Sequence, residues 1–181
     1  MADINSPNRS SLPSSGPSPA KPGANPLFLR EEELRQGIEM LFFGYRDFIS
    51  EPDRILADRG LGRAHHRVIY FVGRYPGSTV SSLLSILQIT KQSLSRVLSQ
   101  LVEEGYIVQR QGTSDRRQRL LTLTDKGRAL EEQLTETQRQ RLARAYRQAG
   151  AEAVEGFRKV MLGIMSDDED RSRFGAAKRR P

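Results

Sequence analysis

Five charged residues between positions 110 and 119 form the most distinctive chemical feature of the sequence. They are Arg110, Asp115, Arg116, Arg117 and Arg119. Guanidinium groups held this close together repel one another unless an anion lies among them. Arginines at the tip of a hairpin can enter a narrow A·T-rich minor groove of DNA, where negative potential is concentrated. The cluster therefore indicates a loop that contacts DNA.

A second candidate surface lies on a helix that is predicted to begin after residue 90. Its apolar residues recur at three- and four-residue intervals and define one buried face: Leu94, Val97, Leu98, Leu101 and Val102. On the other face Arg96 can donate two hydrogen bonds to guanine, and Gln92 can pair with adenine. This face is predicted to read DNA bases, and an ordinary solvated surface is the alternative. The candidate residues are Thr90, Lys91, Gln92, Ser93, Ser95, Arg96 and Ser99.

The composition excludes several classes of function. The chain has 181 residues, a formal net charge of +7 and no cysteine, so it has neither disulfides nor thiolate nucleophiles. It has no HExxH motif and no glycine-rich phosphate loop, and we expect neither enzymatic activity nor a cofactor. No apolar run approaches the roughly 18 residues that a membrane span needs, so no membrane partner is expected. The lack of cysteine is compatible with a cytoplasmic location.

Helical periodicity accounts for most of the chain before these two surfaces. A first helix is predicted over about residues 29–51, and Pro52 is expected to end or bend it. A second helix is predicted to stop at the segment "YPGST", because proline cannot continue a helical ladder. Ser78 or Thr79 then caps a short third helix.

Two strands are predicted after the polar-faced helix, which Gly105 ends. Residues 106–111 form the first strand and residues 117–124 the second, in which Leu121 and Leu123 alternate with their neighbours. Helices followed by a hairpin make a winged helix-turn-helix, whose second motif helix enters the major groove of double-stranded DNA. The predicted fold class is therefore mainly α with a small β-hairpin wing.

Long helices are predicted to follow the wing, over about residues 125–165, with Thr124 as the first cap. A compact winged helix does not need these apolar helix faces to complete its core. A homodimer would bury them between two subunits. Folding back upon their own domain is the alternative. Four arginines of this region are spread around the helix, which favours solubility or pairing between subunits over DNA contact: Arg139, Arg141, Arg144 and Arg147.

The segments "ITKQSLSRVLSQLVEEGYIVQR" and "DRRQRLLTLTDKG" resemble the signature region of the MarR family of bacterial transcriptional regulators. The resemblance covers residues 27–165, and "LFLREEELRQGIEMLFFGYRDF" with "GRAHHRVIYFVGRYPG" is similar to the PetP-like branch. It implies a winged helix-turn-helix over about residues 62–124, flanked by dimerisation helices over about residues 29–51 and 125–165. It also implies that Asp115 shapes the wing and that Arg117 reaches the minor groove.

The same resemblance implies a pocket for a small aromatic effector between the dimerisation helices and the winged domain. Aromatic walls with a few polar groups suit such a ligand, and the candidate lining is Phe42, Arg46, His65, His66, Tyr70 and Tyr75. The alternative is that these side chains belong to the hydrophobic core. A metal site on His65 and His66 is disfavoured, since adjacent side chains on a helix point about 100° apart.

The two ends of the chain are predicted to lie outside the folded domain. Residues 1–26 are rich in serine, proline and glycine, which is typical of a disordered tail. Residues 166–181 form a charged tail that we expect not to fold alone. The predicted function is sequence-specific binding to double-stranded DNA by a homodimer on a near-palindromic operator. The alternative is a winged-helix module that contacts protein or RNA.

Overall fold

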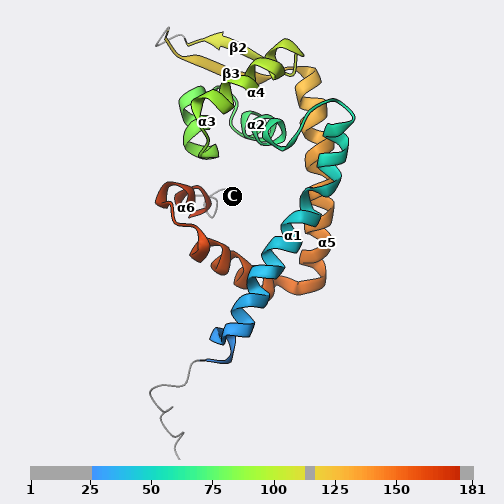
Figure 1. Cartoon of the computed structure of the whole chain (residues 1–181), viewed down its shortest axis with the longest axis vertical. Coiled ribbons are helices and arrows are strands. Elements are labelled where there is room, and N and C mark those ends of the chain that lie inside the picture. The colour runs from blue at the N-terminus through green and yellow to red at the C-terminus, as the bar shows by residue number, and fades with distance from the viewer. Residues whose placement is uncertain (1–25, 113–116, 176–181) are drawn as a thin grey trace, which may run out of the picture. The chain divides into compact units, whose positions relative to one another are not determined.

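The computed structural model describes residues 26–112 and 117–175, and the chain divides into two compact units, residues 1–42 and 43–181. Figure 1 shows the elements in chain order. The helices and strands are η1 (Leu27–Leu29), α1 (Glu31–Ala57), α2 (Arg63–Arg74), β1 (Ser78–Thr79), α3 (Val80–Leu87), α4 (Lys91–Glu103), β2 (Ile107–Gln111), β3 (Arg119–Leu123), α5 (Asp125–Ile164) and α6 (Asp168–Gly175). This confirms a mainly helical fold with a small antiparallel sheet.

The first unit contains η1 and the beginning of α1. Three glutamates occupy the first turn of α1, where the positive end of the helix dipole favours them. Glu31 also accepts a hydrogen bond of 2.8 Å from Arg35. The apolar side chains of this part of α1 are exposed, including Leu34, Ile38 and Phe42.

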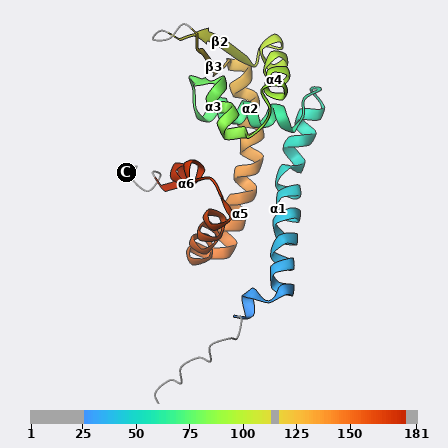
Figure 2. The same cartoon turned by 60° about the vertical axis from the view of Figure 1, so that its left-hand side comes forward.

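The second unit has a hydrophobic core shared by the end of α1, α2, α3, α4, the sheet and the start of α5. Figure 2 shows α2, α3 and α4 gathered beside β2 and β3. Val72, Leu83, Leu94, Leu121 and Leu134 each come from a different one of these elements, and all five are fully buried. The predicted alternation in β3 is confirmed, because Leu121 and Leu123 are buried while Leu120 and Thr122 are partly exposed.

Threonine caps begin three of the helices in this unit. The hydroxyl oxygens of Thr79, Thr90 and Thr124 accept hydrogen bonds from backbone N–H groups at the start of α3, α4 and α5. The caps predicted at Thr90 and Thr124 are confirmed, and Thr79 rather than Ser78 caps α3. Gly105 follows α4 with φ +75°, the left-handed conformation expected of a glycine stop.

The helix predicted to stop or bend at Pro52 continues to Ala57, so Pro52 does not end α1. A proline inside a helix removes one hydrogen bond and costs about 3 kcal/mol. Here the extra turn places Ile55 and Leu56 in the core, where they are 6% and 0% exposed. The free energy gained by burying these two side chains offsets the cost of the hydrogen bond that Pro52 removes.

The sheet has a third strand that the sequence did not predict. Ser78 and Thr79 form β1, which pairs antiparallel with Leu121 and Leu120 of β3, so the strand order is β1-β3-β2. A strand of two residues is too short to show alternation of apolar and polar side chains. Its partner strand β3 lies about forty residues further along the chain, so no local pattern indicates the pairing.

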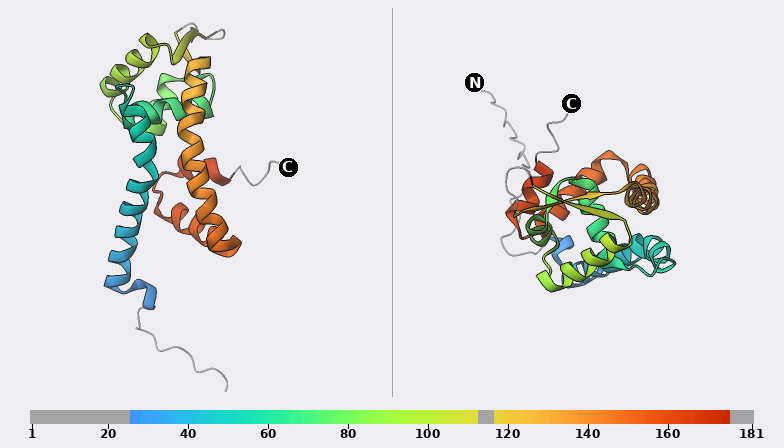
Figure 3. Two further views of the ribbon diagram at one scale, coloured as in Figure 1. Left: turned by 90° about the vertical axis from the view of Figure 1, so that its right-hand side faces the viewer. Right: turned by 90° about the horizontal axis from the view of Figure 1, so that it is seen from above.

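The long segment after the wing is broken at Gly150, which has φ 82° and ψ 167°. This agrees with the prediction of one long helix followed by another, and Figure 3 shows the change of direction within α5. No helix in residues 26–112 and 117–175 is both long and apolar enough to span a membrane.

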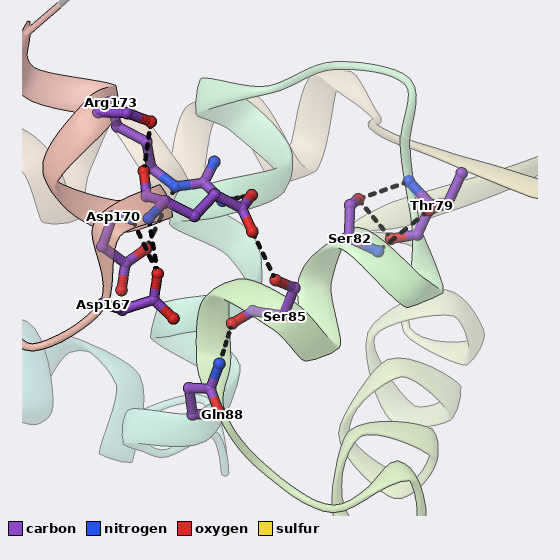
Figure 4. A network of polar contacts seen from close by, with 9 residues as sticks. Thr79, Ser82, Ser85, Gln88, Asp167, Asp170 and Arg173 are labelled. Carbon is purple, nitrogen blue, oxygen red and sulfur yellow. Dashed lines mark hydrogen bonds and ion pairs between the residues drawn. The ribbon is translucent and has the colours of Figure 1, made fainter.

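Helix α6 lies in the segment that we expected not to fold alone. The Asp167 carboxylate accepts a hydrogen bond of 2.7 Å from the backbone N–H of Glu169, which caps the first turn. Arg173 pairs with Glu169 at 2.6 Å and with Asp170 at 3.2 Å. Figure 4 shows Arg173 and Asp170 together with Asp167. Ser85 of α3 also donates a 3.4 Å hydrogen bond to Glu169, so α6 gains contacts beyond its own sequence.

Candidate nucleic-acid interface

The recognition-helix candidates all lie on the exposed side of α4. Leu94, Val97, Leu98 and Leu101 turn the opposite face into the core. Thr90 opens the helix by accepting from the Ser93 N–H at 3.2 Å, and its hydroxyl donates to the Ser93 hydroxyl at 2.9 Å. The exposed residues are Thr90, Lys91, Gln92, Ser93, Ser95, Arg96 and Ser99.

Four of these side chains share one surface. Lys91, Gln92, Ser95 and Arg96 line a shallow depression on the first two turns of α4. Residues at positions i and i+4 are neighbours on a helix, so Gln92 and Arg96 lie side by side. None of the four is acidic, and the first turn of α4 contains no acidic residue. The surface can therefore donate several hydrogen bonds to an electronegative partner.

The wing is a hairpin of β2 and β3 whose register is defined on both strands. Arg110 pairs with Leu120, and Gln111 pairs with Arg119. Because successive side chains on a strand alternate between faces, Arg119 lies on the same face as the buried Leu121, while Arg110 lies on the other face. The two arginines are exposed but do not form a single patch.

The tip of the wing is only partly described. Gly112 donates a backbone hydrogen bond of 3.0 Å to the Gln118 carbonyl, and Arg117 is exposed. Asp115 and Arg116 lie outside the described residues. The roles of Asp115, Arg116 and Arg117 at the tip remain predictions.

The turn between α4 and β2 is packed tightly against the start of α5. The Tyr106 carbonyl accepts the Thr124 N–H at 3.0 Å. A Cβ added to Gly127 would lie 2.1 Å from that carbonyl oxygen, closer than a carbon atom can approach. Only glycine fits at position 127, and this close approach holds the turn that follows the recognition helix against the long helix α5.

A cavity of about 520 Å³ lies between the later part of α1, α2 and α5. Of the predicted pocket residues, His66 and Tyr70 line it. The remaining lining comes from three helices and includes Tyr45, Phe48, Ile49, Arg67, Phe71, Thr135, Gln138, Arg139 and Leu142.

The other predicted pocket residues lie elsewhere. Phe42 is 63% exposed, and Arg46 pairs with Asp47 at 2.9 Å. Tyr75 stacks on Phe71, with ring centroids 6.4 Å apart. His65 faces α4, where its Nε2 lies 2.8 Å from Oε1 of Gln100.

Arg67 and Arg139 were not among the predicted pocket residues, although both line the cavity. Arg139 was interpreted as a residue of the helix surface. The spacing of Thr135, Gln138 and Leu142 with Arg139 is a signal that could have identified it, since these four positions share one helical face.

His66 is the buried titratable group of this cavity. Burial lowers the pKa of the imidazole from its ordinary value of 6.5. The negative charges of Asp53 and Glu131 oppose that shift, and Arg67 adds to it. Among residues 26–112 and 117–175, no three His, Cys, Asp or Glu side chains are grouped so that they could hold a metal ion.

Comparison with known proteins agrees with this architecture of a winged helix-turn-helix between long helices. The MarR family model matches residues 59–118. The HTH-type transcriptional regulator PetP of Rhodobacter capsulatus is 52% identical over 143 residues, which cover 79% of this chain and 86% of PetP.

Solved structures share the fold at lower sequence identity. A crystal structure of a MarR family transcription regulator has a TM-score of 0.63 at 21% identity and covers 82% of this chain and 95% of its own. FabT of Streptococcus pneumoniae, solved in complex with DNA, has a TM-score of 0.63 at 20% identity and covers 72% of this chain and 94% of FabT.

The fold and the exposed helix face define a winged helix-turn-helix protein. The chain belongs to the MarR family of transcriptional regulators, and its similarity to PetP confirms the PetP-like branch. It is a helix-turn-helix transcriptional regulator rather than an enzyme.

Proposed function

We propose that the protein binds double-stranded DNA sequence-specifically as a homodimer on a near-palindromic operator. The observation that carries this proposal is the exposed face of α4, where Lys91, Gln92, Ser95 and Arg96 share one surface that contains no acidic side chain. The major groove admits a helix and presents hydrogen-bond acceptors that Arg96 and Gln92 can distinguish. The serines and Lys91 suit contacts to the phosphate backbone.

The hairpin would contact the groove next to the one that α4 enters. Arg110 on β2, Arg117 in the turn before β3 and Arg119 at the start of β3 are exposed. Because Arg110 and Arg119 lie on opposite faces of the hairpin, they would reach different walls of a groove. Arg117, closest to the tip, is the residue that we assign to the minor groove.

The homodimer is proposed because large apolar side chains are exposed on the long helices. Within the first unit Leu34, Ile38 and Phe42 are 50–68% exposed, and within the second Phe157 and Val160 are 46% and 61% exposed. Contiguous exposed apolar surface on a protein marks an interaction site. A two-fold dimer would place two copies of α4 roughly 34–36 Å apart, which is one turn of DNA.

A small aromatic effector is proposed for the cavity that His66 and Tyr70 line. A volume of about 520 Å³ lies within the range of small-molecule sites. Its walls combine the rings of Tyr45, Phe48 and Tyr70 with the guanidinium group of Arg139. That combination suits an aromatic acid, whose ring packs on the apolar wall and whose carboxylate meets the cation.

DNA binding is tested by measuring the affinity of four variants for duplex DNA across a salt titration. Arg117→Ala should weaken binding and reduce the slope of log affinity against log salt by about 0.9 for each phosphate that the variant no longer neutralises. Gln92→Ala and Arg96→Ala should each lose about 1–3 kcal/mol of discrimination at a definite base pair. Arg158→Ala removes the same charge as Arg117→Ala from the exposed surface of α5 and serves as the matched control.

The assignment of the wing fails if Arg117→Ala binds the duplex as tightly as the parent at every salt concentration. The assignment of base recognition to Gln92 and Arg96 fails if Gln92→Ala and Arg96→Ala both select the parental consensus from random duplexes. Competition by RNA equal to that of duplex DNA would favour the alternative of an RNA-contacting module.

The effector proposal is tested by a thermal-shift screen with benzoic and phenolic acids. A compound that binds the cavity should raise the melting temperature of the parent more than that of Arg139→Ala. A compound that shifts both proteins equally binds elsewhere, and a lack of any shift would favour a regulator controlled by its abundance.

A further inference from the structure

His65 belongs to the first turn of α2, and its side chain faces the recognition helix α4. Its Nδ1 accepts a hydrogen bond of 3.0 Å from the backbone N–H of Gly62, the residue before α2. Since a neutral imidazole has one acceptor and one donor nitrogen, Nε2 carries the proton. The Nε2–H group donates a hydrogen bond of 2.8 Å to Oε1 of Gln100. His65 therefore caps the start of α2 and is also hydrogen-bonded to α4.

The chain of hydrogen bonds continues through Gln100 to the end of α4. The side-chain amide of Gln100 donates a 2.8 Å hydrogen bond to Oε1 of Glu104, the C-cap residue of α4. The Glu104 carbonyl in turn accepts from Nζ of Lys126 in α5 at 2.7 Å. The second half of α4 is thereby held from two sides, by α2 through His65 and by α5 through Lys126.

Within residues 26–112 and 117–175, the exposed side chains of the first half of α4 make no such hydrogen bond to another element, and Ser93 bonds only to the cap residue Thr90. Gln100 follows Arg96 by one helical turn and Gln92 by two, so the three side chains lie along one side of the helix. A bond that holds Gln100 against α2 therefore limits rotation of α4 about its axis. The direction in which Arg96 and Gln92 point depends on that rotation.

We propose that His65 is a positioning residue for DNA recognition, which sets the rotation of α4 through its hydrogen bond to Gln100. This inference rests on the proposed function, because it assigns the positioning of the surface that would read bases. It also separates His65 from the cavity, which its neighbour His66 lines. The two adjacent histidines face different parts of the molecule because side chains at successive helical positions point about 100° apart.

Two substitutions separate the cap of α2 from the hydrogen bond to α4. In His65→Asn the side-chain oxygen can still accept from the Gly62 N–H, but the shorter side chain cannot reach Gln100. In His65→Gln the side-chain amide can accept from Gly62 in the manner of a capping box and donate to Gln100 as well. His65→Gln is therefore the matched control that retains both hydrogen bonds.

The probes are the duplex that the parent selects most strongly from a random-sequence pool and a scrambled duplex of equal length and composition. His65→Asn should bind the selected duplex about three- to tenfold more weakly than the parent, the effect of removing one hydrogen bond. Its affinity for the scrambled duplex and its salt slope should stay unchanged, because no phosphate contact is removed. His65→Gln should restore the parental discrimination between the two duplexes.

A double-mutant cycle tests whether His65 acts through Gln100. Gln100→Ala should reproduce the weakening seen with His65→Asn, and the double variant should bind no more weakly than either single variant. Equal weakening for both duplexes, or full affinity of His65→Asn for the selected duplex, would overturn the positioning role alone. A parent that does not distinguish the selected from the scrambled duplex would overturn the proposed function together with this inference.

Discussion

The core of the winged domain and the apolar stripes of the long helices contain the same kinds of side chain at the same spacing, but their environments differ. Val72, Leu94 and Leu134 are fully buried within the second unit. Ile38 in the first unit is 68% exposed, and Val160 near the end of α5 is 61% exposed. Helical periodicity identifies an apolar face in both regions. What covers that face depends on elements distant in the sequence or on a second molecule.

Helix α5 contains both environments. Leu130 and Leu134 near its start are 4% and 0% exposed, whereas Leu142 is 39% exposed and Phe157 is 46% exposed. The exposure of these side chains increases along α5 although all four are large and apolar. The increase therefore reflects the point at which α5 leaves the core of the winged domain. The beginning of α5 belongs to the core, and the remainder is available to a partner.

The largest effect is expected from Leu134→Ala, which truncates a fully buried side chain. The missing apolar packing and the remaining void should lower the free energy of unfolding by about 2–5 kcal/mol. Chemical denaturation measures this decrease, and Leu142→Ala on the same helix is the matched control. A decrease from Leu142→Ala as large as that from Leu134→Ala would show that the two regions do not differ as the exposure values indicate.

A smaller effect on stability, but a clear one on association, is expected from Ile38→Asp. An apolar side chain contributes about 1.5–3 kcal/mol when buried, and a two-fold dimer buries two copies. With about 1.4 kcal/mol per tenfold change, the dimer dissociation constant should rise at least about hundredfold. Sedimentation velocity over a range of protein concentrations measures this constant.

Gln36→Asp introduces the same charge on the same helix, away from the apolar stripe, and should leave the dimer intact. Gln36 and Ile38 are two positions apart and so do not face the same direction. A parent that sediments only as a monomer at micromolar concentration would contradict the dimer. Equal dissociation by Gln36→Asp would contradict the assignment of Ile38 to the interface.

The smallest effect is expected from the pH dependence that His66 contributes. Its pKa is lowered in the folded protein, so the unfolded chain binds more protons near the ordinary value of 6.5. The free energy of unfolding should therefore fall as the pH falls through that value, by at most about 1.4 kcal/mol per pH unit. Denaturant titrations from about pH 8 to about pH 5 should show a weaker dependence in His66→Gln. An unchanged dependence would show that other groups produce it.

Elements of the site that depend on local chemistry were predictable. Thr90 and Thr124 are capping residues whose hydroxyl groups need only the next turn of the chain, and both caps are confirmed. The alternation of Leu121 and Leu123 predicted a strand with one buried face, and β3 has that face. The exposed residues of α4 followed from the same reasoning, because their buried neighbours determine which face remains outside.

Elements that depend on distant partners were not predictable. The strand β1 exists because Ser78 and Thr79 meet Leu120 and Leu121. Helix α6 forms in a charged segment whose local ion pairs are supplemented by a hydrogen bond from Ser85. The residue pattern of each segment gives no information about the distant residues that it contacts.

The sequence by itself determined the order of the helices, the caps that begin them, the hairpin and the polar face of α4, since each depends on neighbours within a few residues. Only the tertiary structure decided that His66 lines a cavity while His65 is bonded to Gln100. It also decided that Arg67 and Arg139 share that cavity. Helical spacing determines the angle between two side chains on a helix. It does not determine which elements each side chain meets, because those elements are positioned by packing between segments distant in the sequence.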